Sequence, residues 1–292
     1  SNTTARETDA LLKKPVDVVT PNGFDADAIL DKKQSAEKRQ VARKKIFEVA
    51  EALFNRKFSD DTFLTITSGR YEFRNKGINL FISAIAEMAN RNPEKEILAF
   101  VKIPANHKGA DPGLVHRMGN PLYKHPNKEV YLTHGLYEEH SDAILHEIRN
   151  NGLKNLPDDK VKIIFVPAYL NGNDGVFNMP YYNLLAGFDF TIFPSYYEPW
   201  GFTPMESVAF RVPTLTTCQA GFGQWVDETF DGDHPGVVVA DRTDDNDQDM
   251  VKQIADAIEY YLNLSDKKME DARENASNIA KAATWEKFFE KY

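Results

Sequence analysis

The chain has 292 residues, of which 42% are hydrophobic and 27% are charged. This composition is typical of a globular protein with one or two hydrophobic cores. The formal net charge of −9 disfavours nucleic-acid binders and proteins that bind anionic membranes, because both usually present a basic face.

Apolar runs of strand length alternate with helical periodicity along the chain. The predicted strands are Thr62–Thr67, Ile97–Ile103, Val161–Val166, Phe190–Phe193, Pro213–Thr216 and Val237–Ala240. The predicted helices are Ala36–Phe54, Gly77–Arg91, Ser141–Asn151, Tyr181–Ala186, Pro204–Phe210, Asp247–Leu264, Asp266–Ala283 and Trp285–Tyr292. Strands that are hydrophobic throughout and alternate with helices predict an α/β fold. We therefore expect a Rossmann-like, doubly wound parallel sheet of about six strands with helices on both faces. Ligands of such sheets bind at the carboxyl ends of the strands.

The predicted domain organisation is simple. Residues 1–20 form a linker that leads into a single domain covering residues 21–292. The stretch Pro104–Glu139 is interrupted by glycine and proline and has no clear period, so we predict a surface insertion there.

The cysteine content limits the chemistry and the compartment. The single cysteine, Cys218, excludes an internal disulfide and a cysteine-based metal site, and a lone thiol suits a reducing cytoplasm. The acidic loop Asp241–Asp249 lacks the glycine and the final glutamate of an EF-hand, so we predict no metal site there. No apolar run reaches the ~18 residues that indicate a membrane span.

The first group of candidate site residues follows the first predicted strand, in the loop SGRYEFRNKG at residues 68–77. Arg70 and Lys76 at the carboxyl end of a parallel strand could grip an anion, since arginine offers a bidentate fork and lysine a compact charge. The alternative is a solvated loop whose cations face water. The loop does not match the pattern of a P-loop.

The second candidate group lies in FPSYYEPWGFTPMES, residues 193–207. Thr203, Pro204 and Glu206 match a capping box with Thr203 as the N-cap. The backbone N–H groups of Gly201, Phe202 and Thr203 would then face an anion at a helix N-terminus. Glu198 has no comparable role in local structure, so it is a better candidate than Glu206 for contact with a ligand.

A tyrosine follows the loop AYLNGNDGVFNMP. Tyr181 begins a short predicted helix, where its ring could stack on a nucleobase. The alternative is that Tyr181 is a core aromatic residue.

Five segments together resemble the carboxyl-terminal half of glycogen synthases, most closely the animal and fungal type. They are TPNGF (20–24), SGRYEFRNKG (68–77), THGLYEEHSDAILHEIRNNGL (133–153), VKIIFVPAYL (161–170) and FPSYYEPWGFTPMES (193–207). The likeness is collinear from about residue 10 to the end. It implies the donor-binding half of a retaining glycosyltransferase with two Rossmann domains, the GT-B architecture.

The resemblance also implies roles for individual residues. Glu198 would lie near the glucosyl group, and Glu206 would contact the ribose. Arg70 and Lys76 would neutralise the diphosphate as it leaves. Tyr181 would stack on the base, while Gly201, Phe202 and Thr203, with Trp200 beside them, would hold the distal phosphate and the sugar.

The implied substrates are UDP-glucose or ADP-glucose as donor and an α-1,4-glucan as acceptor, with no metal or other cofactor. The glucan would be bound largely by an amino-terminal domain that has no counterpart in these residues, so we expect this fragment alone to be inactive. Two alternatives stay open: another retaining GT-B enzyme related to sucrose or trehalose synthases, or a non-catalytic nucleotide-sugar-binding module.

Two departures from the animal and fungal pattern favour a bacterial-type relative. Acidic residues interrupt the stretch SDKKMEDARENASNIAKAATW, where those enzymes carry an arginine-rich helix that senses glucose 6-phosphate. The insertion Pro104–Glu139 is shorter than the one that builds their tetramer. We therefore expect neither that regulation nor that tetramer, and the sequence leaves the oligomeric state open.

Overall fold

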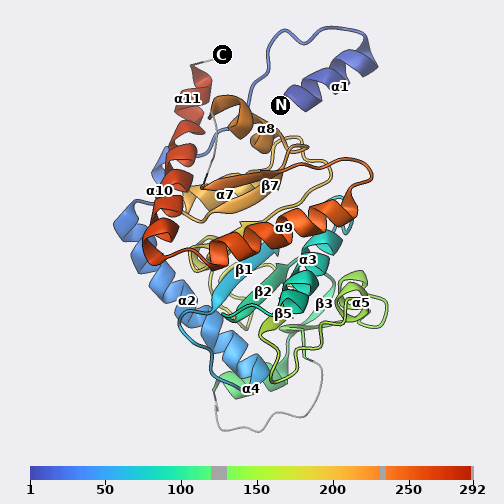
Figure 1. Cartoon of the computed structure of the whole chain (residues 1–292), viewed down its shortest axis with the longest axis vertical. Helices are drawn as coiled ribbons and strands as arrows, with labels where there is room; N and C mark the ends of the chain where they lie inside the picture. The colour runs from blue at the N-terminus through green and yellow to red at the C-terminus, as the bar shows by residue number, and fades with distance from the viewer. Residues whose placement is uncertain (120–129, 231–234, 291–292) are drawn as a thin grey trace.

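The computed structural model describes residues 1–119, 130–230 and 235–290. Its centre is a six-stranded sheet with the order β5-β2-β1-β6-β7-β8, in which every pair is parallel (Figure 1). The strands are β1 (Phe63–Ser68), β2 (Ile97–Lys102), β5 (Val161–Phe165), β6 (Phe190–Ile192), β7 (Thr214–Thr217) and β8 (Val237–Ala240). Each predicted strand is present, and its ends lie within one residue of the expected ends. The predicted fold class is confirmed.

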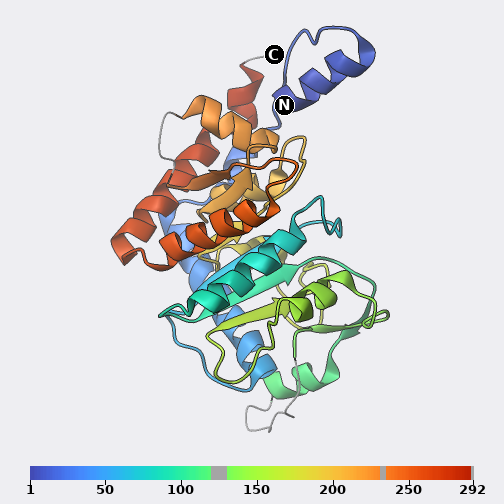
Figure 2. The same cartoon turned by 45° about the vertical axis from the view of Figure 1, so that its right-hand side comes forward.

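Helices cover both faces of this sheet. One face is covered by α3 (Ile78–Arg91), α5 (Ala143–Asn150) and α9 (Asp247–Leu262), and α3 and α9 run side by side in Figure 2. The other face is covered by α2 (Lys32–Phe54), α6 (Tyr181–Leu185), α7 (Phe202–Ala209), α8 (Gly221–Thr229), α10 (Asp266–Ala282) and α11 (Trp285–Phe289). The strands are apolar throughout because each side of the sheet meets its own layer of buried side chains.

Helix α2 shows why some predicted ends were displaced. It starts at Lys32, four residues before the predicted start, because Asp31 and Gln34 form a capping box. The Asp31 carboxylate accepts the Gln34 N–H at 2.7 Å, and the Gln34 side chain accepts the Asp31 N–H at 3.1 Å.

The segment 104–139 contains more regular structure than its sequence predicts. It holds β3 (His107–Ala110), α4 (Pro112–Met118) and β4 (His134–Leu136), and β3 and β4 form a separate antiparallel pair. Leu114 and His134 are fully buried, so this segment contributes to the interior as well as to the surface. Residues 120–129 of the predicted insertion lie outside the described part.

The predicted linker at residues 1–20 contains a helix, α1 (Asn2–Leu12), none of whose residues is buried. Figures 1 and 2 both show α1 at the end of the molecule where α8 and α11 lie. The short 3₁₀ helix η1 (Ala26–Ala28) then leads into α2. Within the described residues, no helix has the length and apolar character needed to cross a membrane.

Candidate functional site

The two predicted site loops follow neighbouring strands at the centre of the sheet. After β1 the chain builds β2 and β5 on one side, and it then returns to place β6 on the other side of β1. The order of strands therefore reverses between β1 and β6. Ligands of open α/β sheets bind at such a switch point, outside the carboxyl ends of the strands. The loops 68–77 and 193–201 both lie there.

Backbone contacts hold these two loops together. The Tyr196 N–H donates to the Asn75 carbonyl at 2.8 Å. Gly77 has a φ of 63°, and a Cβ added to it would lie 2.0 Å from the Pro194 carbonyl oxygen. Only glycine allows both this conformation and this close approach.

The loops also share an ion pair. The Lys76 ammonium donates to Oε2 of Glu198, and the two side chains are 15% and 20% exposed. Sequence reasoning predicted both residues for the site, and the structure brings them together. This pair places opposite charges at the carboxyl ends of β1 and β6.

Arg70 is not part of that pair. Its side chain is 76% exposed, and its Nε lies 3.0 Å from Oε1 of Glu72 in the same loop. Arg70 therefore lies at the rim of the switch point, where an exposed ion pair is worth at most ~1 kcal/mol and is easily exchanged.

The predicted capping box at Thr203 is wrong. Helix α7 begins at Phe202, with Gly201 as its N-cap at a φ of 106° and no side-chain cap. The left-handed conformation of Gly201 starts the helix two residues early, which places Thr203 inside the first turn. Glu206 consequently has no capping role, and its carboxylate is used elsewhere.

The carboxylate of Glu206 is bound by Tyr182 from the start of α6. The Tyr182 hydroxyl donates to Oε1 of Glu206 at 2.8 Å, and the Tyr182 ring stacks on Phe210 with 5.4 Å between centroids. Burial raises the pKa of Glu206, and the Tyr182 hydrogen bond opposes that shift. Burial and the same hydrogen bond raise the pKa of Tyr182 to about 12. Tyr182, which adjoins the predicted Tyr181, thus joins the candidate site through Glu206.

Tyr181 is anchored to the end of β1. Its hydroxyl lies 2.7 Å from the Ser68 Oγ, and burial raises its pKa. The side chain of Tyr181 is half-buried. Its buried part fits the predicted core role, and its exposed part leaves room for the predicted stacking role.

Trp200 lies in the core, contrary to its predicted place among the donor-binding side chains. Its side chain is buried (4% exposed) against the rings of Phe222, Trp225 and Phe288. The turn formed by residues 198–201, here called the hook, therefore points the Trp200 ring inward, while Phe202 is 49% exposed at the start of α7. A ligand at the hook would meet the backbone of Trp200 rather than its indole.

The hook is also bound to the segment after β7. The Glu198 carbonyl accepts the Gly221 N–H at 3.0 Å, and the Trp200 carbonyl accepts the Phe222 N–H at 2.7 Å. From the amino-terminal segment, Glu7 accepts a hydrogen bond of 2.6 Å from the Tyr197 hydroxyl. These contacts fix the backbone on both sides of Glu198.

Helix N-termini without side-chain caps collect at this edge of the sheet. In the described part of the chain, five α-helices directly follow a strand of the six-stranded sheet, and all five begin without a side-chain cap: α3, α6, α7, α8 and α9. The other described α-helices all have one. The first N–H groups of α6 and α8 donate instead to backbone carbonyls, including those of Leu170 and Glu198. The aligned helix dipoles still give this edge a positive potential, in which an anion is favoured.

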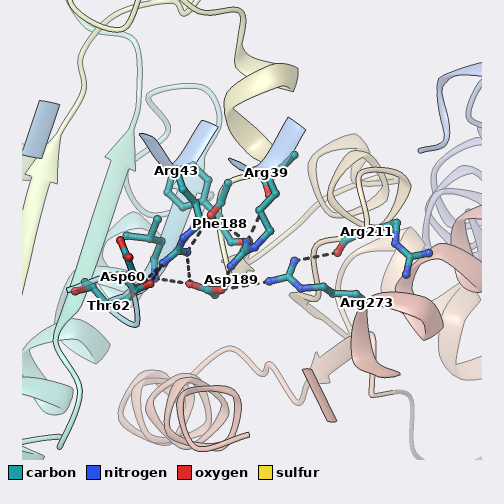
Figure 3. A network of polar contacts seen from close by, with 11 residues as sticks. Arg39, Arg43, Asp60, Thr62, Phe188, Asp189, Arg211 and Arg273 are labelled. Carbon is teal, nitrogen blue, oxygen red and sulfur yellow. Dashed lines mark hydrogen bonds and ion pairs between the residues drawn. The ribbon is translucent and has the colours of Figure 1, made fainter. Parts of the chain in front are cut away.

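A second polar cluster lies at the opposite edge of the sheet, around Asp189 (Figure 3). Arg39, Arg43 and Arg273 contact its carboxylate at 2.5, 2.9 and 3.2 Å, and it also accepts the Leu64 N–H at 2.9 Å. These charges hold the pKa of Asp189 at about 2, although burial alone would raise it.

The arginines of this cluster also donate to backbone carbonyls, including those of Phe188, Thr62 and Arg211. Their donors are therefore engaged in joining α2, α10 and the starts of β1 and β6. We assign this cluster a structural role. No residue in it was predicted from the sequence, because the pairs are far apart in the chain.

The described residues contain no group of three or more histidine, cysteine, aspartate or glutamate side chains that could hold a metal. This includes the acidic loop Asp241–Asp249, where the carboxylates have partners such as Arg242 and Tyr196.

Comparison with known proteins establishes the family. The sequence profile of glycogen synthases matches residues 1–111 and 124–292. The chain belongs to the glycogen synthase family. The unmatched residues fall inside the segment 104–139.

Individual relatives are distant but match along the whole chain. The sequence is 25% identical to glycogen [starch] synthase isoform 1 of Saccharomyces cerevisiae, covering 98% of this chain and 50% of that protein. It is 26% identical to the Neurospora crassa glycogen [starch] synthase, covering 100% of this chain and 50% of that protein. The chain thus spans about half the length of the curated relatives it matches.

Solved structures share the fold at lower identity. A glycosyltransferase from Rickettsia africae has a TM-score of 0.58 at 14% identity, over 100% of this chain and 60% of that one. The pneumococcal O-GlcNAc transferase GtfA, solved with UDP and GlcNAc, has a TM-score of 0.55 at 14% identity, over 100% of this chain and 42% of that one. This family and these glycosyltransferase folds support the resemblance on which the predicted site depends.

Proposed function

We propose that this chain is the donor-binding domain of a retaining glucosyltransferase that elongates an α-1,4-glucan from UDP-glucose or ADP-glucose. The observation that carries the proposal is the meeting of Lys76, Glu198 and the uncapped start of α7 at the switch point of the sheet. A cytoplasmic location belongs to the proposal, because a single thiol suits a reducing compartment.

The chemistry of glucosyl transfer suits these groups. Breaking the bond between glucose and the diphosphate develops negative charge on the diphosphate and positive charge on the sugar. Lys76 and the N–H groups of Gly201, Phe202 and Thr203 would stabilise the diphosphate without reorganising. Arg70, at the rim, would exchange Glu72 for a phosphate oxygen.

The two glutamates would act differently. Glu198, already paired with Lys76, would lie beside the sugar and offset its developing positive charge. Glu206 would accept hydrogen bonds from the ribose hydroxyls, oriented by Tyr182. Tyr181 would provide the face on which the base stacks. The glucan would be bound together with a further domain, so we propose that the chain alone binds nucleotide but does not extend glucan.

Calorimetric titration with UDP and with ADP tests the site. We expect the chain to bind at least one of the two, and Arg70→Ala and Glu206→Ala each to weaken binding about tenfold, as for the loss of a hydrogen bond to a charged group. Arg56→Ala is the matched control for arginine, because Arg56 lies near the amino end of β1 and pairs with Glu96. The assignment would be contradicted if the parent chain bound neither nucleotide, or if neither substitution changed the affinity.

A further inference from the structure

Lys102 is a cation at the same edge of the sheet that the predicted site does not use. It is the last residue of β2, the strand next to β1. Its Nζ lies 5.1 Å from the ring centroid of Tyr181 and 5.5 Å from that of Tyr169. The ammonium therefore lies within cation–π distance of both the tyrosine that we assign to the nucleobase and a second, exposed tyrosine.

The ammonium of Lys102 has no hydrogen-bond acceptor among the residues that the structure describes. An ammonium carries three donors and no acceptor. Two ring faces attract its charge but accept no conventional hydrogen bond. Burial lowers the pKa of Lys102, and the charge of Glu206 opposes that shift. The side chain is thus partly desolvated and still has donors to offer.

We propose that Lys102 is a specificity-determining residue that donates a hydrogen bond to a carbonyl oxygen of the nucleobase stacked on Tyr181. This inference rests on the proposed function, since it assumes that a nucleoside diphosphate occupies the site. Lys102 has a flexible four-carbon side chain, so its ammonium can reach any base that stacks on the Tyr181 ring.

The chemistry of the bases gives this contact a preference. Uracil presents two carbonyl oxygens at its edge, whereas adenine presents an amino donor and ring nitrogens. A donor-only ammonium gains a strong acceptor at either exocyclic oxygen of uracil, whereas the exocyclic group of adenine is itself a donor and only the ring nitrogens of adenine accept. Lys102 therefore favours UDP over ADP. The charge of Glu206 also raises the pKa of Lys102, which favours the charged form of the ammonium.

The test is calorimetric titration of the 292-residue chain and of Lys102→Met with UDP, ADP and CDP. Methionine keeps an unbranched side chain that packs on the two rings and removes the charge. We expect Lys102→Met to bind UDP about tenfold more weakly or worse, and ADP within about threefold of the parent. Lys102→Arg keeps a donor and should retain most of the affinity for UDP. CDP identifies the acceptor: an equal loss for CDP assigns the oxygen at position 2, and no loss assigns the oxygen at position 4.

Lys108→Met is the matched control, because Lys108 also lies over a tyrosine ring, 5.6 Å from the centroid of Tyr137, but on β3 outside the site. It should leave all three affinities unchanged, and thermal unfolding of each variant should show that it is folded. Equal weakening of UDP and ADP by Lys102→Met, or no weakening of either, overturns the role of Lys102 while leaving the site intact. Failure of the parent chain to bind any of the three nucleotides would instead remove the proposed function itself.

Discussion

Lys76 and Glu198 form an ion pair across the switch point of the sheet, although 122 residues separate them in the sequence. The pair joins the loop after β1 to the loop after β6, and both side chains are largely shielded from water. Each partner therefore controls how much charge the other can offer to a ligand.

Glu198→Gln should strengthen the binding of UDP. Removing the carboxylate frees the charge of Lys76 for the diphosphate. Partly exposed ion pairs are worth ~0.2–1 kcal/mol, so the affinity should rise by up to about fivefold. Calorimetry with UDP measures this. Glu51→Gln is a matched control, because Glu51 is equally exposed and pairs with Lys57 away from the site. An unchanged or lower affinity in Glu198→Gln would mean that Lys76 does not face the diphosphate.

The affinity for UDP should depend on the protonation of Glu206. Burial raises the pKa of this carboxyl above the ordinary glutamate value of 4.5, so the charged form that accepts from the ribose disappears at a higher pH than usual. In Tyr182→Phe the stabilising hydrogen bond is lost, and the pKa of Glu206 rises further. The fall in UDP affinity on acidification should therefore begin at a higher pH in the variant than in the parent.

Titrations of both proteins with UDP between pH 4 and pH 8, ~1 pH unit apart, measure this shift. The phosphate of UDP titrates identically in the two series, so only the difference between the proteins is interpreted. Coincident pH profiles would show that Tyr182 does not hold the Glu206 carboxylate.

Asp189→Asn should destabilise the fold without being part of the nucleotide site. Removing one partner from a buried cluster of charges costs ~3–5 kcal/mol, and urea unfolding should show a loss of that order. Asp61→Asn is the control, because Asp61 and Asp189 line one surface pocket but the side chain of Asp61 is exposed. A loss of stability no greater than in the control would contradict the structural role of Asp189.

The same cluster should contribute to the loss of folding stability at low pH. The pKa of Asp189 is about 2 in the folded chain and 3.8 as its ordinary value. Because the folded-state pKa is the lower of the two, the contribution is complete above pH 3.8 and is lost as the pH falls toward about 2. Urea unfolding measured across this range should show a steeper decline in the parent than in Asp189→Asn.

Gly77→Ala should disrupt the junction of the two site loops. The added Cβ would meet the Pro194 carbonyl oxygen at 2.0 Å, in addition to the strain of a left-handed alanine. Gly109→Ala separates the two effects, because Gly109 has a φ of 98° and nothing within 4 Å of an added Cβ. We expect Gly109→Ala to cost ~1 kcal/mol, and Gly77→Ala to cost more and to abolish UDP binding. If Gly77→Ala and Gly109→Ala lost the same stability and Gly77→Ala bound UDP normally, the close approach of Gly77 to the Pro194 carbonyl would be contradicted.

Much of the fold follows from local sequence because each central strand is buried on both faces and reads as a continuous apolar run. Helix α8 was missed because Gly221 and Gly223 in its first turn have low helix propensity. The elements β3, α4 and β4 were missed because their few buried residues, such as Leu114 and His134, show no period.

The site was predictable only to the level of the backbone. Parallel strands bring their carboxyl ends to one edge, which places Lys76 and Glu198 near each other, but the sequence does not say which side chains point together. The predicted capping box of Thr203 and Glu206 was wrong because the start of α7 depends on the φ of Gly201. Lys102 could have been predicted from the sequence, since a charged residue at the carboxyl end of a buried strand lies at the ligand-binding edge of the sheet.

The most direct test of the central claim is a crystal structure of the chain with UDP. We predict the diphosphate between Lys76 and the first N–H groups of α7, with uracil on the ring of Tyr181. Uridine diphosphate bound elsewhere, for example against the arginines around Asp189, would contradict the account.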